Sequence, residues 1–235
     1  MFKIKNNQFR MIEKKNNNSI LRRLFLFSFF FLVYSMAFGH TIKYDLENAP
    51  NGSVIWYYLK LGFTHILPKG FDHILFVIGL CLLSNKIKVI LWQATAFTVA
   101  HSITLALSMK NIIVVPSSIV EPIIALSIVF VALENLVLTK LKPWRIIVVF
   151  LFGLIHGLGF ASALNEIGLP RNKFATSILS FNLGVELGQI SIILLMFGLI
   201  VIPLGEKLWY RKGIVFPLSI AIAIVAGFWT IQRVI

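Results

Sequence analysis

Histidines and carboxylates are the residues with the clearest chemistry here, because most of their neighbours are apolar. One short stretch contains three potential metal ligands, His65, Asp72 and His73, at the start of an apolar segment. Imidazole nitrogens and carboxylate oxygens bind divalent transition metals, so this stretch is the first candidate for chemistry. Pro68 and Gly70 predict a helix break between the two histidines, which would let the first fold back over the Asp-His pair.

Further ionisable residues occur inside apolar segments downstream. Burying such groups without partners is costly in a membrane, so we expect them to face one another or water. The residues assigned to a candidate metal site are His65, Asp72, His73, His101, His156, Glu186 and Glu121. The residues that could line a path across the membrane are Glu134, Asn135, Asn182 and Gln189.

Each of these residues also has a structural interpretation. A single histidine such as His101 or His156 often forms a hydrogen bond between packed helices, and Glu134 fits a solvated helix end or a cap. The convergence of several histidines favours a metal site. Imidazole with carboxylate suits Ni²⁺, Zn²⁺ or Co²⁺, whereas copper(I) would prefer Met and Cys ligands. Gly153 and Gly157 predict a close helix approach around His156.

The composition indicates a polytopic membrane protein of the all-α class. The chain has 235 residues, of which 58% are hydrophobic and 13% are charged, more apolar than a soluble domain accommodates. The net charge of +13 comes from short basic clusters between apolar runs. Such clusters are typical of topology determinants rather than of a nucleic-acid surface, so the expected environment is a lipid bilayer.

The chain divides into three predicted regions. Residues 1–39 combine a basic start with an apolar run that ends in the small residues Ala37 and Gly39, which predicts a signal peptide cleaved after Gly39; the alternative is an uncleaved first span. Residues 40–60 form an external arm and an interfacial segment, and residues 61–235 form the transmembrane domain. Its six transmembrane helices are expected at about 61–84, 87–109, 117–139, 144–164, 174–203 and 213–233.

Basic residues in the connections predict the orientation of the six helices. They are more numerous in the first, third and fifth connections, namely Lys86, Lys88, Lys140, Lys142, Arg145, Lys207, Arg211 and Lys212. The positive-inside rule places these connections in the cytoplasm and both mature termini outside a bacterial inner membrane. The candidate ligands then lie in the outer half of the membrane.

The candidate residues lie in a series of motifs over residues 54–200. The motifs are His65-Ile66-Leu67, Gly70-x-Asp72-His73-Ile74-Leu75-Phe76, Phe97-Thr98-x-Ala100-His101-Ser102-x-Thr104-Leu105, Val120-Glu121-Pro122, Glu134-Asn135, Phe152-Gly153-Leu154-x-His156-Gly157-x-Gly159-Phe160-Ala161 and Phe181-Asn182-x-Gly184-Val185-Glu186-Leu187-Gly188-Gln189. As a set, they resemble the HupE/UreJ family of membrane proteins, especially its second branch.

The resemblance implies nickel supply to hydrogenases and ureases. The family's first-span motif, a His followed by Gly-x-Asp-His, is regarded as important for transport and implicates His65, Asp72 and His73. This chain has one additional residue before Asp72, at Pro68-Lys69, and Val77 where nickel permeases tend to have Met. The identity of the metal therefore stays open among nickel, zinc and cobalt.

The leading hypothesis is a permease that takes a divalent metal, nickel first, from the outer side. No nucleotide-binding motif of the phosphate-cradling type occurs, which favours facilitated passage. One alternative is an intramembrane zinc-dependent metalloenzyme, a hydrolase with Glu186 or Glu121 as general base. Another is a metal-sensing or assembly protein. No catalytic residue or organic cofactor is assigned, and a homo-oligomer is left open.

Overall fold

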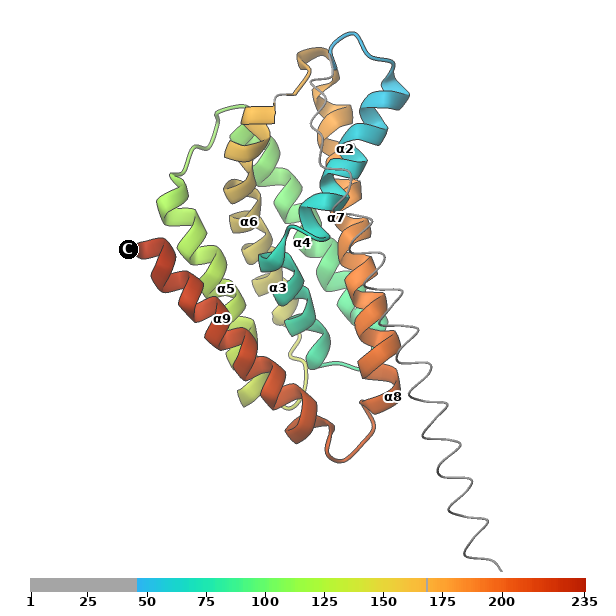
Figure 1. Cartoon of the computed structure of the whole chain (residues 1–235), viewed down its shortest axis with the longest axis vertical. Coiled ribbons are helices and arrows are strands. Elements are labelled where there is room, and N and C mark those ends of the chain that lie inside the picture. Colours follow the sequence, from blue (N-terminus) through green and yellow to red (C-terminus); the bar gives the residue numbers. More distant parts are fainter. Residues whose placement is uncertain (1–45, 168) are drawn as a thin grey trace, which may run out of the picture. The chain divides into compact units, whose positions relative to one another are not determined.

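A bundle of helices forms the described part of the chain (Figure 1). The computed structural model describes residues 46–167 and 169–235, with the side chains of all of these but 162 and 165–167. No strand occurs in these residues, which confirms the all-α class. The predicted signal peptide over residues 1–39 lies outside the described residues.

Seven main helices make up the bundle. They are α2 (Asn51–Ile66), α3 (Phe71–Leu82), α4 (Ile87–Met109), α5 (Ser117–Val137), α6 (Arg145–Ile167), α7 (Phe174–Met196) and α9 (Phe216–Val234). Shorter helical pieces are η1 (Arg171–Lys173), η2 (Phe197–Val201), α8 (Ile202–Leu204) and η3 (Arg211–Val215). Apart from the first, the helices begin and end within a few residues of the predicted spans.

Among the described residues, four helical segments are long and apolar enough to cross a membrane. They are Ile87–Met109, Ser117–Val137, Arg171–Leu204 and Arg211–Val234. The pair formed by α2 and α3 is a fifth candidate if its two bent halves make one span. Large apolar side chains such as Trp92, Leu151 and Phe228 are exposed on the outside of the bundle, which is typical of surfaces that face lipid.

The helix break predicted at Pro68 and Gly70 is confirmed, but the predicted helix start at about 61 is wrong. Helix α2 already begins at Asn51, and the axes of α2 and α3 differ by 68°. Tertiary packing explains the early start, because Val54 and Tyr58 are fully buried. Local polarity suggested an arm in this region, whereas α2 lies against α7 along its length.

The remaining helices pack in pairs around α3. Helix α4 lies against α6 and α7, and α5 lies against α9 and α6. The short helix α3 is central, with contacts to α5 and α7 and smaller contacts to α4 and α9 (Figure 1). His73, in the first turn of α3, is buried in the bundle, although Phe71 at the start of the same helix is exposed.

Glycines bring α4 and α6 together, as their spacing predicted. A Cβ atom at Gly153 would overlap the carbonyl oxygen of Phe97, and one at Gly157 would overlap the carbonyl oxygen of His101. Neither obstacle is a flexible side chain. Helices α4 and α6 can therefore pack this closely only with glycine at both positions.

Substituting Gly157→Ala is expected to lower stability by about 1–3 kcal/mol, because the helices must move apart to admit the methyl group. Thermal unfolding of the purified protein in detergent measures this loss. The matched control is Gly227→Ala in α9, where nothing lies within 4 Å of the added Cβ. The control should be neutral or slightly stabilising. Equal unfolding temperatures for the two variants would contradict the assigned contact.

Candidate metal centre

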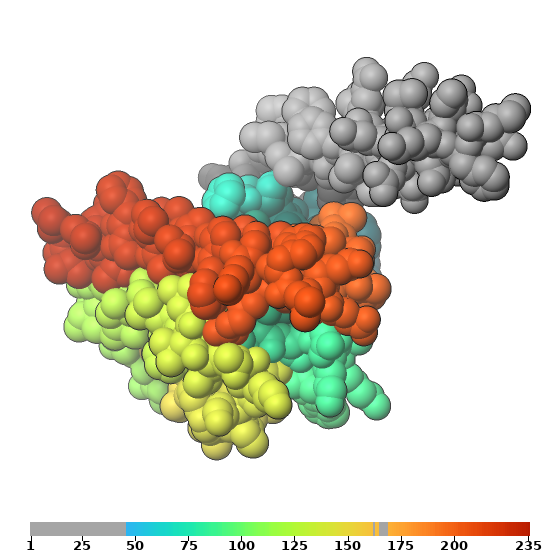
Figure 2. Space-filling view, turned by 90° about the horizontal axis from the view of Figure 1, so that it is seen from below, coloured from blue at the N-terminus to red at the C-terminus, as the bar shows by residue number. Residues whose placement is uncertain are grey.

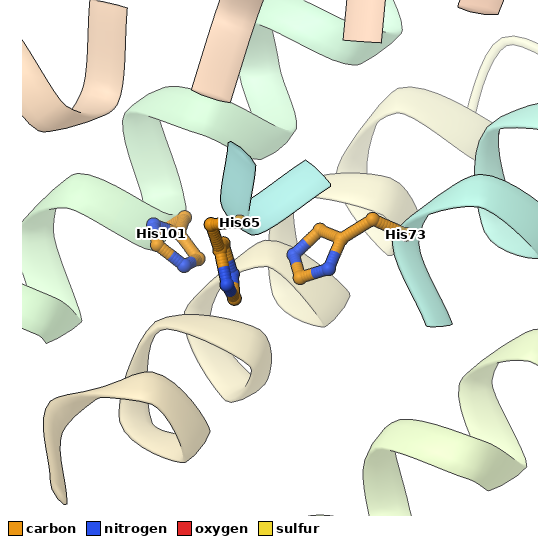
Figure 3. Close-up of side chains that lie close together, drawn as sticks. All are labelled: His65, His73 and His101. Atoms are coloured by element: carbon orange, nitrogen blue, oxygen red, sulfur yellow. The ribbon is translucent and has the colours of Figure 1, made fainter. Parts of the chain in front are cut away.

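Three histidines from three helices converge inside the bundle. His65 lies at the end of α2, His73 in the first turn of α3, and His101 in the interior of α4. One ring nitrogen from each lies within 4.8 Å of those of the other two. Figure 3 shows the three rings close together, with His65 between the other two in this view. The helix break produces this arrangement, because the turn between α2 and α3 brings two of the three ligands together.

His156 of α6 extends the group to four histidines. Its ring centroid lies 5.1 Å from that of His73, which in turn lies 4.9 Å from that of His65. The Nε2 atoms of all four histidines are buried and have no hydrogen-bond partner among the described residues. An unsatisfied buried nitrogen is costly, and four of them in one place indicate a site for a bound ligand.

Asn182 of α7 fixes the tautomer of His101. Its amide nitrogen donates to the carbonyl oxygen of Ile178 at 2.8 Å, so its oxygen faces the His101 Nδ1 atom at 3.0 Å. The Nδ1 atom must therefore carry the proton. This leaves the lone pair on Nε2, the form in which imidazole binds a metal.

His156 is held in the same tautomer by a backbone group. Its Nδ1 atom lies 2.8 Å from the carbonyl oxygen of Phe152, which can only accept a hydrogen bond. Nδ1 is then the donor and Nε2 keeps its lone pair. Two of the four histidines are thus oriented as ligands before any ion is bound, which lowers the cost of binding one.

Aromatic rings enclose the histidines. The centroid of the Phe160 ring lies 3.9 Å from that of His65, and Phe160 stacks on Phe181 at 5.0 Å. Phe97 packs against His73 and His156 at 5.7 Å and 4.8 Å. These rings pack against the imidazoles and limit their rotation, which helps to hold them in position as ligands.

A pocket of about 430 Å³ leads to the histidines from one side. Its lining includes three of the four histidines and four charged residues, namely His65, His73, His156, Lys69, Asp72, Glu121 and Arg233. Two of these charges are positive and two are negative, so the pocket wall carries no net charge in their ionised forms. A bound divalent ion would add positive charge that Asp72 and Glu121 can offset.

The structure does not place the predicted carboxylates in the three-histidine group. Both carboxylate oxygens of Asp72 accept hydrogen bonds from Arg233 Nη2, at 3.1 Å and 3.0 Å. Glu121 is exposed and lines the pocket, and Glu186 accepts a hydrogen bond from the Thr95 hydroxyl at 2.7 Å. Asp72 and His73 contact different groups, since Asp72 binds Arg233 of α9 whereas His73 packs against His65 of α2.

The predicted path residues lie in two places. Asn182 orients His101, and Gln189 accepts a hydrogen bond from the Thr98 hydroxyl at 3.2 Å, so both link α4 to α7. Glu134 forms an ion pair with Arg145 at 2.9 Å, and Asn135 donates to the Gly79 carbonyl oxygen at 2.8 Å. The second group lies toward the far end of α3 from His73.

Sequence reasoning missed two arginines that contact predicted site residues. Arg145 was interpreted as a loop charge, but its side chain is only 1% exposed beside Glu134. Arg233 was not singled out, although it binds Asp72. The signal for both was the same: each acidic residue inside an apolar segment needs a partner. The sequence did not indicate which basic residue would supply it.

Comparison with known proteins agrees with this architecture. The sequence model of a family described as HupE / UreJ protein matches residues 41–233. Searches of curated proteins and of solved structures found no match. The family is associated with nickel or cobalt transport or with metallocentre assembly. Because the match covers the whole helical bundle but for its last residues, the chain belongs to the HupE/UreJ family.

Proposed function

We propose that this protein is a permease for a divalent transition metal, with nickel as the first candidate. The observation that carries the proposal is the set of four buried Nε2 atoms without partners, which four different helices supply. Two of them are held in the metal-binding tautomer by Asn182 and by the Phe152 carbonyl. Family membership supports the same class of substrate.

The donor set favours nickel, cobalt or zinc over other cations. Imidazole nitrogens suit these borderline metals, whereas Mg²⁺ and Ca²⁺ prefer oxygen ligands and copper(I) prefers sulfur. The three-residue group contains neither cysteine nor carboxylate. A site built only from neutral imidazoles holds a divalent ion less strongly than one with several anionic ligands, which suits an ion that must leave again.

The proposed topology has six spans, with the α2 and α3 pair as the first and α6 as the fourth. Helix α6 has 23 residues, as does α4, which is enough to cross a hydrocarbon core of about 30 Å. Basic connections face the cytoplasm of a bacterial inner membrane, and the 430 Å³ pocket opens toward the outer side. Metal would enter from there.

The hydrolase alternative is less well supported. A zinc hydrolase needs a carboxylate or another base beside the metal-bound water. Neither predicted base belongs to the three-histidine group: Glu186 accepts a hydrogen bond from Thr95, and Glu121 is exposed at the pocket wall. A sensing or assembly role shares the metal site and differs only in whether the ion crosses the membrane.

Counterflow of radioactive nickel in proteoliposomes tests the proposal. Wild-type protein should accumulate labelled nickel against an internal pool of unlabelled nickel, and His101→Ala should not. Binding of nickel in detergent is measured on the same preparations. If the wild type binds nickel in detergent but moves none across the vesicle membrane, the permease proposal is wrong and a sensor or assembly protein remains.

The ion pair between Asp72 and Arg233 is expected to set the affinity of the pocket for cations. The two side chains are 27% and 23% exposed, and their bonds hold Asp72 on the α9 side of the pocket. An arriving divalent ion competes with Arg233 for this carboxylate. Arg233→Gln should therefore tighten nickel binding, and Asp72→Asn should weaken it, each by roughly fivefold.

Isothermal titration of nickel into the purified variants measures both shifts. The opposite signs serve as the control, because a general loss of structure would weaken binding in both variants. The double variant should lie between the two single ones. A weakening of similar size in both single variants would contradict the competition and assign the pair to helix packing alone.

A further inference from the structure

A second pocket, of about 590 Å³, lies at the other end of α3 from His73. Three chain connections meet around it: the links from α3 to α4, from α5 to α6 and from α8 to α9. Figure 2 views the molecule from this end, with the link into α6 and the segment leading into α9 in front. This pocket shares no lining residue with the pocket beside the histidines.

The charged residues that line this second pocket are all basic. Lys86, Lys140 and Arg211 line it from three different connections, and no lining residue among those described is acidic. Basic side chains spread over three loops could point away from one another into solvent. Here they border one concavity, so their repulsion is relieved by a bound anion.

Arg211 is fixed in place. Its Nη1 and Nη2 atoms donate to the carbonyl oxygens of Leu138 and Leu136 at 2.8 Å and 3.1 Å, and its guanidinium lies over the Phe216 ring. These contacts use only part of its donor capacity. The remaining N–H groups are held rigidly and can donate to two oxygens of one anion, such as a phosphate.

Neutral donors complete the lining. The hydroxyl of Tyr210 is buried and has no hydrogen-bond partner among the described residues. Burial, with a smaller contribution from Cys81, raises the pKa of Tyr210, so the hydroxyl stays a proton donor at neutral pH. Ser84, Asn85 and Thr139 add further polar side chains to the wall.

We infer that this pocket binds the phosphate group of an anionic membrane phospholipid. The chemistry of the wall favours a phosphate, because three cations from three connections border one concavity together with polar side chains. The position selects a lipid as its source, because four candidate membrane helices begin or end here. Exposed apolar side chains flank the pocket on these helices, with Val137 77% and Ile202 71% exposed.

Such a lipid would join the three connections, each of which repels the others by charge. Its acyl chains would lie along the exposed apolar side chains of α5 and α8, while its headgroup bridged Lys86, Lys140 and Arg211. The lipid would therefore stabilise this end of the bundle. The inference does not rest on the metal site, so its test is independent of the test of the proposed transport.

Native mass spectrometry and thermal unfolding of the purified full chain test the inference. Phosphatidylglycerol should remain bound and raise the unfolding temperature, whereas phosphatidylcholine at the same concentration should not. The double variant Lys86→Gln/Lys140→Gln should weaken phosphatidylglycerol binding roughly tenfold or more. The matched control is Lys142→Gln/Lys212→Gln, because both residues are exposed neighbours of the pocket cations and neither lines the pocket.

Three outcomes would overturn the inference. Equal losses in the pocket variant and the control variant would show that general surface charge, not the pocket, attracts the lipid. Equal stabilisation by phosphatidylcholine would remove the role of the anionic group. Stabilisation by inorganic phosphate that the pocket variant abolishes, without retention of phosphatidylglycerol, would reassign the pocket to a soluble phosphate.

Discussion

Replacing His73 by alanine is expected to weaken nickel binding by at least about 100-fold and to abolish transport. The ring centroid of His73 lies 4.9 Å from that of His65 and 5.1 Å from that of His156, and His73 is 6% exposed. His73 is one of the three residues whose ring nitrogens make up the three-histidine group. Loss of one direct ligand should exceed the roughly 10- to 100-fold cost of losing a residue that only orients a ligand.

Competition with a coloured chelator measures this affinity, and elemental analysis measures the amount of metal that copurifies. The comparison variant is Asn182→Ala, which keeps all four histidines but removes the hydrogen bond that orients His101. It should retain metal at reduced affinity. Lowering the pH should release nickel from the wild type, since protons compete for the same nitrogens. Unchanged nickel content in His73→Ala would refute the assigned centre.

The histidine cluster was predictable from sequence because its elements are local or periodic. Pro68 and Gly70 interrupt a helix regardless of its tertiary surroundings. The break between α2 and α3 brings His65 close to His73, which is only a few residues away in the sequence. His101 and His156 lie in long apolar helices, where an ionisable side chain needs a polar interaction partner. The glycine spacing in α6 likewise predicted a close approach to α4.

The partners of the acidic residues were not predictable in the same way. Asp72 binds Arg233, which lies 161 positions later in the chain, and no local pattern relates the two. The start of α2 was missed for a related reason. Packing against α7 stabilises its first turns, whereas the sequence around Asn51 and Gly52 is polar and suggests an arm. Tertiary contacts determine both features, and composition does not encode them.

Breaking the buried ion pair between Glu134 and Arg145 is expected to have the largest effect on stability. The two side chains are 4% and 1% exposed and lie 2.9 Å apart, at the junction of α5 and α6. Glu134→Ala leaves the Arg145 charge buried, with a long hydrogen bond of 3.5 Å to the Asn135 amide oxygen. Removing one partner of such a pair costs about 3–5 kcal/mol, because the other charge keeps its desolvation penalty.

The double variant Glu134→Met/Arg145→Met separates this penalty from the value of the pair itself. Without either charge, the apolar replacements should recover most of the stability lost in the single variant. Chemical unfolding in mixed micelles measures all three proteins. The more exposed pair of Asp72 and Arg233 serves as the comparison, since breaking it should cost about 1 kcal/mol or less. If the double variant were as unstable as Glu134→Ala, the ion pair would itself be an essential element of the fold. Recovery would instead mean that stability alone does not require these two charges in the membrane, which favours a role for them along the proposed transport path.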